Sequence, residues 1–183
     1  MAEYTLKDGR RLVLRDPVKE DASTMLAYAR TVGGETDFLL IDENGLGDLT
    51  LEGEEEWIRS TLAAPNTKMF LGFVEGELVL LCDVRACNSR ARIAHNAVVA
   101  ISVKRDYWRL GIGSIAMRSM IDFAKGTGAL RTLSLEVREG NERAISLYKR
   151  FGFQEIGRHK GRIQIRGSYY DEILMDLDLT AAQ

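Results

Sequence analysis

Two glycines at the start of an expected helix constrain this chain more than any other feature of its sequence. Residues 107–114 read YWRLGIGS, so Gly111 and Gly113 flank Ile112 where an apolar helical stripe begins. Glycines leave backbone N–H groups unobstructed by Cβ atoms, and a helix N-terminus carries several N–H groups without an intrahelical partner. The segment therefore predicts a main-chain site for an anion. A glycine-rich turn kept only for tight packing is the structural alternative.

The same glycines also fit the loose pattern GxGxx(G/A) of dinucleotide-binding folds, with Ala116 in the last position. In those folds the glycine turn directly follows the first strand of a βαβ unit. Here residues 104–110 separate the glycines from the preceding expected strand, and several strands come earlier. The sequence also lacks the GxxxxGK(S/T) motif of ATP-binding loops. A nucleotide-linked oxidoreductase is therefore disfavoured.

A second informative helix is expected from Asn141 to Phe151, with Gly152 ending it. Asn141 is a favourable N-cap residue. Tyr148 falls on the apolar face of this helix together with Ile145, so its ring should be buried. A buried tyrosine needs a partner for its hydroxyl group. Either a backbone carbonyl in the core or a reacting group at a functional site would supply that partner.

Hydrophobic periodicity predicts one α/β domain over residues 1–183, with a central mixed sheet of six or seven strands and about four helices. Glu75-Gly76 is expected to form a tight turn, because the glycine can take a positive φ. Residues 33–53 show little periodicity. The expected strands cover residues 11–15, 69–74, 77–84, 92–103, 130–137, 153–164 and 169–179, and the expected helices cover residues 21–30, a segment opening at residue 54, 113–125 and 141–151.

Composition narrows the classes of function. The 25 basic and 27 acidic residues give a net charge of −2, so no polybasic surface is expected for nucleic acid or an anionic membrane. No apolar run reaches the ~18–20 residues of a membrane span, and the first residues do not resemble a signal peptide. Cys82 and Cys87 are expected to be buried, reduced thiols, because no second Cys or His pair follows for a metal site. We therefore expect a cytoplasmic protein without a bound metal.

Residues 101–153 resemble the acetyl-CoA-binding core of the GNAT superfamily of acyltransferases. The first signature of that superfamily, (Q/R)xxGx(G/A), falls on residues 108–113. Trp108 stands where the signature has Gln or Arg, and Arg109 lies one position later. The second signature, NxxAxxxYxxxGF, matches at Asn141, Ala144, Tyr148, Gly152 and Phe153.

The resemblance implies a GNAT-like fold and an N-acetyltransferase that moves the acetyl group of its co-substrate acetyl-CoA to a primary amine by direct attack on the thioester. It assigns the role of general acid to Tyr148, whose phenol has a reference pKa of about 10 and stays protonated at neutral pH. Main-chain amides would hold the diphosphate, and a strand end would pair with the pantetheine arm. The implied coenzyme-binding residues are Ile101, Ser102, Val103, Arg109, Leu110, Gly111, Ile112, Gly113, Ser114 and Asn141.

Glu136 is the candidate general base. It lies in the sequence LEVR, which resembles the strand that carries the catalytic glutamate in bacterial ribosomal-protein alanine acetyltransferases. A solvated or salt-bridged strand carboxylate is the structural alternative. His95 is a second candidate for the base, although a lone histidine in a strand is more often structural.

The signatures leave the acceptor open among a small-molecule amine, a polyamine and a protein N-terminus. The acidic segment 33–56 is either one border of the acceptor site or a solvated loop, and residues 167–171 are a candidate for the opposite wall. Paired subunits are common in the superfamily, so a homodimer is one expected assembly. A non-catalytic acyl-CoA sensor is the alternative function.

Overall fold

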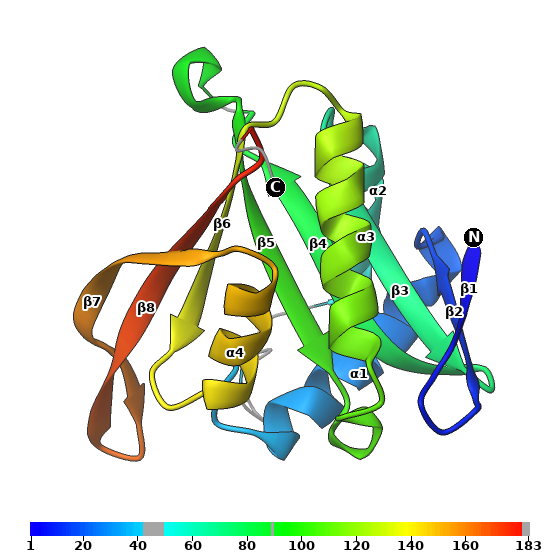
Figure 1. Ribbon diagram of the computed structural model, residues 1–183. Helices are drawn as coiled ribbons and strands as arrows, with labels where there is room; N and C mark the ends of the chain where they lie inside the picture. Colours follow the sequence, from blue (N-terminus) through cyan, green and yellow to red (C-terminus); the bar gives the residue numbers. More distant parts are fainter. Residues whose placement is uncertain (42–49, 89, 181–183) are drawn as a thin grey trace.

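The computed structural model describes residues 1–41, 50–88 and 90–180. Within these ranges, eight strands form one mixed sheet in the order β1-β2-β3-β4-β5-β6-β8-β7 (Figure 1). Every neighbouring pair is antiparallel except β5 with β6, which is parallel. The expected mixed α/β sheet is thus confirmed. The strands are β1 (Ala2–Thr5), β2 (Arg11–Arg15), β3 (Lys68–Val74), β4 (Glu77–Ala86), β5 (Asn96–Val103), β6 (Thr132–Arg138), β7 (Gln154–Ile165) and β8 (Ser168–Asp178).

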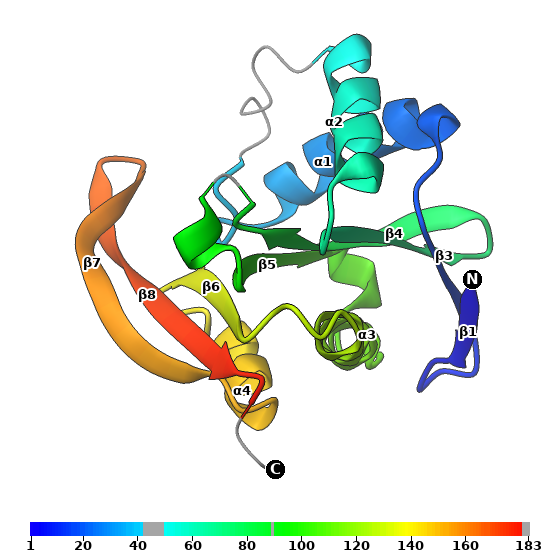
Figure 2. The same ribbon diagram turned by 90° about the horizontal axis from the view of Figure 1, so that it is seen from above.

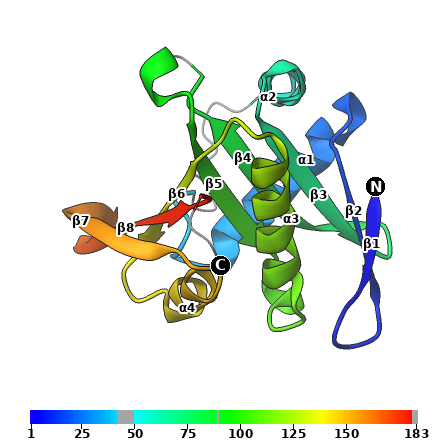
Figure 3. The ribbon, with the colours of Figure 1, turned by 45° about the horizontal axis from the view of Figure 1, so that its top comes forward.

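Helices cover both faces of the sheet. Helices α1 and α2 lie on one face, and α3 and α4 lie on the other (Figures 2 and 3). None of the helices in the described ranges is long and apolar enough to cross a membrane. The helices are α1 (Ala22–Glu35), α2 (Leu51–Ala63), α3 (Ile112–Gly126) and α4 (Glu142–Arg150), and short 3-10 turns cover Lys19–Asp21, Ala91–Ile93 and Arg105–Tyr107.

Each face of the sheet has its own apolar core. On α3 the expected stripe is confirmed, because Ile112, Ala116 and Met120 are buried while Ile115 and Phe123 are partly buried against the same cluster. This cluster joins α3 and α4 to the sheet. The second cluster lies between α1, α2 and the opposite face, and it includes Met25, Tyr28, Ile58 and Leu71.

The turn at Glu75-Gly76 is confirmed, with φ values of 51° and 84° at the two residues. The expected strand count of six or seven is slightly low, because β1 was not predicted. That strand has only four residues and is largely exposed, so it carries no alternating apolar pattern. It pairs along its length with β2 at the edge of the sheet.

Two element boundaries also differ from the prediction. Strand β5 begins at Asn96 rather than residue 92, because the preceding residues form a 3-10 turn. Helix α2 begins at Leu51, where the Thr50 side chain accepts a hydrogen bond from the Gly53 amide at 3.1 Å. Residues 42–49, the centre of the acidic segment, lie outside the described residues.

Strands β5 and β6 pair over only a short stretch. Their parallel register covers Asn96 with Thr132, Ala97 with Leu133 and Val98 with Ser134. Beyond that point both strands continue, to Val103 and Arg138, but they diverge (Figure 1). The sheet therefore opens into a V at the end where β5 leads to α3 and β6 leads to α4.

Asp83 is a buried carboxylate in β4, with 3% of its surface exposed. Burial raises the pKa of Asp83 to about 6, against a partial opposing effect of Arg85. The Arg85 Nε atom lies 3.0 Å from Asp83 Oδ1 as an ion pair, although this contact lacks hydrogen-bond geometry. The folded chain therefore holds a proton on Asp83 to higher pH than the unfolded chain.

This shift predicts that Asp83 lowers stability as the pH rises. The unfolded carboxyl loses its proton near pH 4 and the folded one near pH 6, so the free energy of unfolding should fall through that window. Relative to Asp83→Asn, the wild-type value should drop by about 3 kcal/mol between pH 4 and pH 7. Urea unfolding of both proteins across this range measures the difference, with Asp122→Asn on the exposed side of α3 as the control. Parallel pH curves for wild type and Asp83→Asn would contradict the prediction.

Candidate active site

The glycine segment forms the turn between β5 and α3. Gly111 is the N-cap of α3 and has a φ of 95°, and a Cβ atom there would have no other atom within 4 Å. This glycine is therefore required by the backbone conformation and not by crowding. Within the described residues, the amides of Ile112 and Gly113 have no hydrogen-bond partner, whereas the Ser114 amide already donates to the Gly111 carbonyl at 3.0 Å. Two N–H groups of the first turn thus remain available to an anion.

Gly113 has a different role from Gly111. A Cβ atom at Gly113 would lie 3.1 Å from Cδ2 of Leu147, so the start of α3 packs closely against α4. Tight packing against α4 is therefore the reason that position 113 needs a glycine. The close approach brings the beginning of α3 next to the helix that carries Tyr148.

Trp108, which departs from the first signature, holds the turn together. Its Nε1 atom donates a hydrogen bond to the Val103 carbonyl at the end of β5, at 2.7 Å. The Arg143 guanidinium lies over the Trp108 ring, 3.3 Å from its centroid, and so ties the start of α4 to the same turn. Sequence reasoning missed Arg143, because its contact with Trp108 joins two distant segments of the chain.

Tyr148 lies on the inner side of α4, as its position in the sequence predicts. Asn141 is confirmed as the N-cap, since its side chain accepts a hydrogen bond from the Ala144 amide at 3.3 Å. The Tyr148 side chain is 7% exposed and packs against Phe153, with 6.0 Å between ring centroids. Burial raises the pKa of Tyr148 to about 12. Within the described part of the chain its hydroxyl has no hydrogen-bond partner, so the core does not satisfy this group.

Glu136 lies on the opposite face of the sheet from Tyr148. Its neighbours Leu135 and Val137 are buried in the cluster that contains α3, α4 and Tyr148. Because side chains alternate along a strand, Glu136 points to the face of α1 and α2, where it is exposed. No cationic side chain of the described residues forms an ion pair with the Glu136 carboxylate, and no second carboxylate pairs with it. Of the two structural alternatives, the described residues exclude a salt-bridged carboxylate, and the exposure of Glu136 leaves the solvated one open.

The strand end opposite Glu136 is anchored from α1. The Tyr28 hydroxyl donates a hydrogen bond to the Ser102 carbonyl at 2.7 Å, and it also lies 3.0 Å from the Ser102 hydroxyl oxygen. Ile101 and Val103 pack instead against the cluster on the α3 side. The three residues expected to flank the pantetheine arm thus form the β5 side of the V.

His95 is not brought to this end of the sheet. It precedes β5, whereas residues 101–103 end that strand. At ~3.3 Å per residue, the six residues from His95 to Ile101 span roughly 20 Å along the strand. The cysteines take no part either: Cys82 is buried and Cys87 half-buried, and both are free. In the described ranges, no group of His, Cys, Asp or Glu side chains is arranged to hold a metal ion.

Aromatic and charged side chains border the face on which Glu136 lies. Arg138 packs between Tyr170 of β8 and Phe38, with its guanidinium carbon 3.7 Å and 5.0 Å from the two ring centroids. Arg166, in the turn from β7 to β8, forms an ion pair with Asp37 at 3.2 Å. The β7–β8 hairpin and the segment after α1 therefore meet at Arg138, on the face of the sheet to which Glu136 points.

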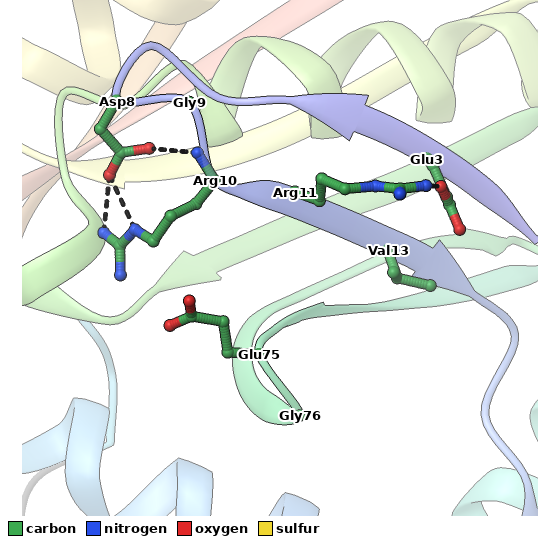
Figure 4. A pocket seen from close by; sticks show the side chains of 8 residues that line it. All are labelled: Glu3, Asp8, Gly9, Arg10, Arg11, Val13, Glu75 and Gly76. Atoms are coloured by element: carbon green, nitrogen blue, oxygen red, sulfur yellow. Dashed lines mark hydrogen bonds and ion pairs between the residues drawn. The ribbon is translucent and has the colours of Figure 1, made fainter.

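Two hollows in the described residues differ in their surroundings. One, of about 490 Å³, lies at the mouth of the V between residues 105–109 and 140–143. The other, of about 670 Å³, lies beside the β1–β2 hairpin and the turn at Glu75-Gly76 (Figure 4). Four of its five charged side chains form ion pairs with each other, Asp8 with Arg10 at 2.8 Å and Glu3 with Arg11, and Glu75 also lines it. The first hollow adjoins the glycine turn and belongs to the candidate site.

Comparison with known proteins agrees with this geometry. Residues 39–153 match the family described as the Acetyltransferase (GNAT) family. The chain is 29% identical over 121 residues to the L-amino acid N-acetyltransferase AaaT of Escherichia coli, covering 65% of this chain and 73% of that protein. It is 32% identical over 120 residues to the ribosomal protein bS18-alanine N-acetyltransferase of Salmonella typhimurium, covering 62% of this chain and 80% of that protein.

A solved structure shares the whole architecture. The acetyltransferase of GNAT family from Streptococcus pneumoniae superposes with a TM-score of 0.86 and is 29% identical, covering 91% of this chain and 98% of that one. The family match spans more than half of the chain and includes both the glycine turn and the helix of Tyr148. The chain therefore belongs to the GNAT family of acetyltransferases, and it is an acyltransferase that uses acetyl-CoA.

Proposed function

We propose that this enzyme transfers the acetyl group of acetyl-CoA to a primary amine, by direct attack of the amine on the thioester in the opening between β5 and β6. The observation that carries the proposal is the V itself, which has free main-chain donors at one end and, on one face, a buried tyrosine whose hydroxyl has no partner among the described residues. The amides of Ile112 and Gly113 hold the diphosphate. The pantetheine arm then runs along residues 101–103 and brings its sulfur beside Tyr148.

In the reaction a C–N bond forms as the C–S bond breaks. The amine gives up a proton to Glu136, and Tyr148 donates a proton to the departing thiolate. Free thiols of this kind have a pKa near 8.5, well below the value of about 12 for Tyr148. Burial, which raises the pKa of Tyr148, raises that of a thiolate beside it for the same reason, because both charged forms lose hydration. The pKa difference that opposes proton donation from Tyr148 to the thiolate is therefore smaller than the difference between about 12 and 8.5.

The two faces of the sheet support this division of roles. Tyr148 reaches the opening from the α4 side, and Glu136 reaches it from the side of α1 and α2. The acceptor enters on the Glu136 face, between the β7–β8 hairpin and the segment after α1. The acceptor is a small-molecule amine, a polyamine or a protein N-terminus. The two relatives are named for acetylation of L-amino acids and of a ribosomal protein, and both kinds of acceptor are among these three classes.

The role of Gly111 predicts a paired result with Gly76. Both glycines have positive φ and open space around the missing Cβ, so alanine at either site should cost about 1–2 kcal/mol of unfolding free energy. Only Gly111→Ala should also disturb the donors at the start of α3 and weaken acetyl-CoA binding about tenfold, the value of one hydrogen bond to a charged group. Calorimetric titration of both variants tests this. Equal coenzyme affinity in the two variants would show that this turn does not bind the diphosphate.

Replacement of Tyr148 by phenylalanine should slow turnover and preserve binding. Loss of a general acid typically costs 10²- to 10⁴-fold in rate, so kcat should fall by about that factor while the affinity for CoA stays the same. Release of free thiol from acetyl-CoA in the presence of an amine panel measures the rate. Tyr4→Phe, on strand β1 at the far edge of the sheet, is the control. An unchanged kcat in Tyr148→Phe would eliminate the role, and no thiol release from the wild type with any amine would favour a non-catalytic acyl-CoA sensor.

Replacement of Glu136 by glutamine should depend on the acceptor. An amine with a pKa of about 10.4 is mostly charged at pH 7 and needs a base, whereas an α-amine near 7.7–8 is already partly neutral. The rate loss at pH 7 should therefore be larger for the lysine-like amine, by about tenfold or more. pH–rate profiles of Glu136→Gln and of Glu155→Gln, an exposed residue of β7, make the comparison. A profile that does not move in Glu136→Gln with the high-pKa amine would show that another group is the base.

A further inference from the structure

An arginine without an ion pair lies beside the candidate base, on the face of the sheet to which Glu136 points. Arg138 follows Glu136 by two residues in β6, so both side chains are on this face and their Cα atoms are ~6.6 Å apart. Phe38, which contacts the Arg138 guanidinium, also lines the hollow of about 490 Å³ at the mouth of the V. Arg138 therefore adjoins the opening in which the proposed reaction takes place.

The positive charge of Arg138 is not balanced by a carboxylate of the described residues, since none forms an ion pair with it. Glu172 is its neighbour across the β6–β8 pair, but the Glu172 carboxylate pairs with His159 at 3.3 Å and with Arg162 at 3.8 Å. Asp37 pairs with the β7–β8 turn at 3.2 Å. Both acids thus have other partners, and the Arg138 guanidinium is left for an anion from outside the protein.

Most N–H groups of Arg138 are unused as well. The Nε atom is buried and has no hydrogen-bond partner in the described ranges. Nη1 donates to the Glu139 carbonyl at 3.4 Å, a long hydrogen bond, and nothing in the described part of the chain accepts from Nη2. A guanidinium binds the two oxygens of a carboxylate through two N–H groups at once. Such a ligand would satisfy donors that the protein leaves open.

Two aromatic rings hold this side chain in place. The Arg138 guanidinium carbon lies 3.7 Å from the ring centroid of Tyr170 and 5.0 Å from that of Phe38. The rings attract the cation, but they carry no net charge and do not replace a carboxylate as acceptors of its N–H groups. A guanidinium that is fixed in position and still unsatisfied is preorganised to bind a carboxylate.

We propose that Arg138 binds a carboxylate of the acceptor, and that the enzyme acetylates amines with a carboxylate close to the amino group, such as free α-amino acids. This inference rests on the proposed function, in which Glu136 takes the proton of the amine. Because Glu136 and Arg138 are neighbours on one face of one strand, they can hold the amino group and the carboxylate of one short molecule. A polyamine has no anion for Arg138, and in a protein N-terminus the α-carboxylate is replaced by an uncharged peptide carbonyl.

The test compares L-amino acids with their α-amides, which keep the amine and the side chain and lack only the carboxylate. Release of free thiol from acetyl-CoA gives kcat/KM for each pair, with spermidine and a short peptide as further acceptors. The acids should exceed their amides by about tenfold or more, the value of hydrogen bonds to a charged group. The state of the amine does not produce this preference, since an α-amine next to an amide carbonyl has a pKa near 7.7–8 and is already partly neutral.

Variants of Arg138 assign the preference to this side chain. Arg138→Gln should lower kcat/KM for the acids by about tenfold and leave that for the amides unchanged. Arg138→Lys keeps the charge and loses the paired donors, so it should recover part of the preference. Arg131→Gln, at an exposed position just before β6, is the matched control and should change neither value. Unchanged calorimetric affinity for CoA shows that each variant is folded.

The other outcomes separate this inference from the proposed function. Equal kcat/KM for acids and amides in the wild type, or a preference for spermidine or the peptide, would overturn the inference and leave the proposed function intact. An equal loss for acids and amides in Arg138→Gln would also overturn it, because Arg138 would then only support the end of β6. No thiol release from the wild type with any acceptor would overturn the proposed function, and this inference with it.

Discussion

The divergence of β5 and β6 after Val98 and Ser134 is the constraint on which the rest of the site depends. Parallel pairing beyond that point would satisfy the backbone of both strands and would close the sheet. Because the strands separate instead, the free edge of β5 can pair with an extended ligand, as an added strand would. The divergence is maintained from both sides, since α3 and α4 pack closely at Gly113 and Leu147, and Tyr28 anchors β5 at Ser102.

Strand alternation then separates the two proton transfers of the proposed reaction. Leu135 and Val137 must face the core between the sheet and the helices α3 and α4, so Glu136 is directed to the other face. Tyr148 is fixed on the core side by its place on α4. An acid and a base that approach from opposite faces cannot neutralise each other directly. The coenzyme and the acceptor amine can therefore enter from different sides and meet in the opening.

Much of this arrangement could be predicted from local sequence patterns. The apolar stripe of α3, the turn at Glu75-Gly76 and the Asn141 cap all depend on neighbouring residues, and the structure confirms them. Strand β1 could not be predicted, because a short, exposed edge strand has no hydrophobic signal. The contact of Trp108 with Arg143 and the parting of β5 from β6 depend on residues distant in the sequence, so no local pattern reveals them.

A crystal structure of the complex with CoA would test the central claim most directly. The account predicts the diphosphate within hydrogen-bond distance of the amides of Ile112 and Gly113, the pantetheine arm alongside residues 101–103, and the sulfur beside the hydroxyl of Tyr148. A diphosphate bound elsewhere, or a sulfur remote from that hydroxyl with the β5–β6 opening empty, would contradict it.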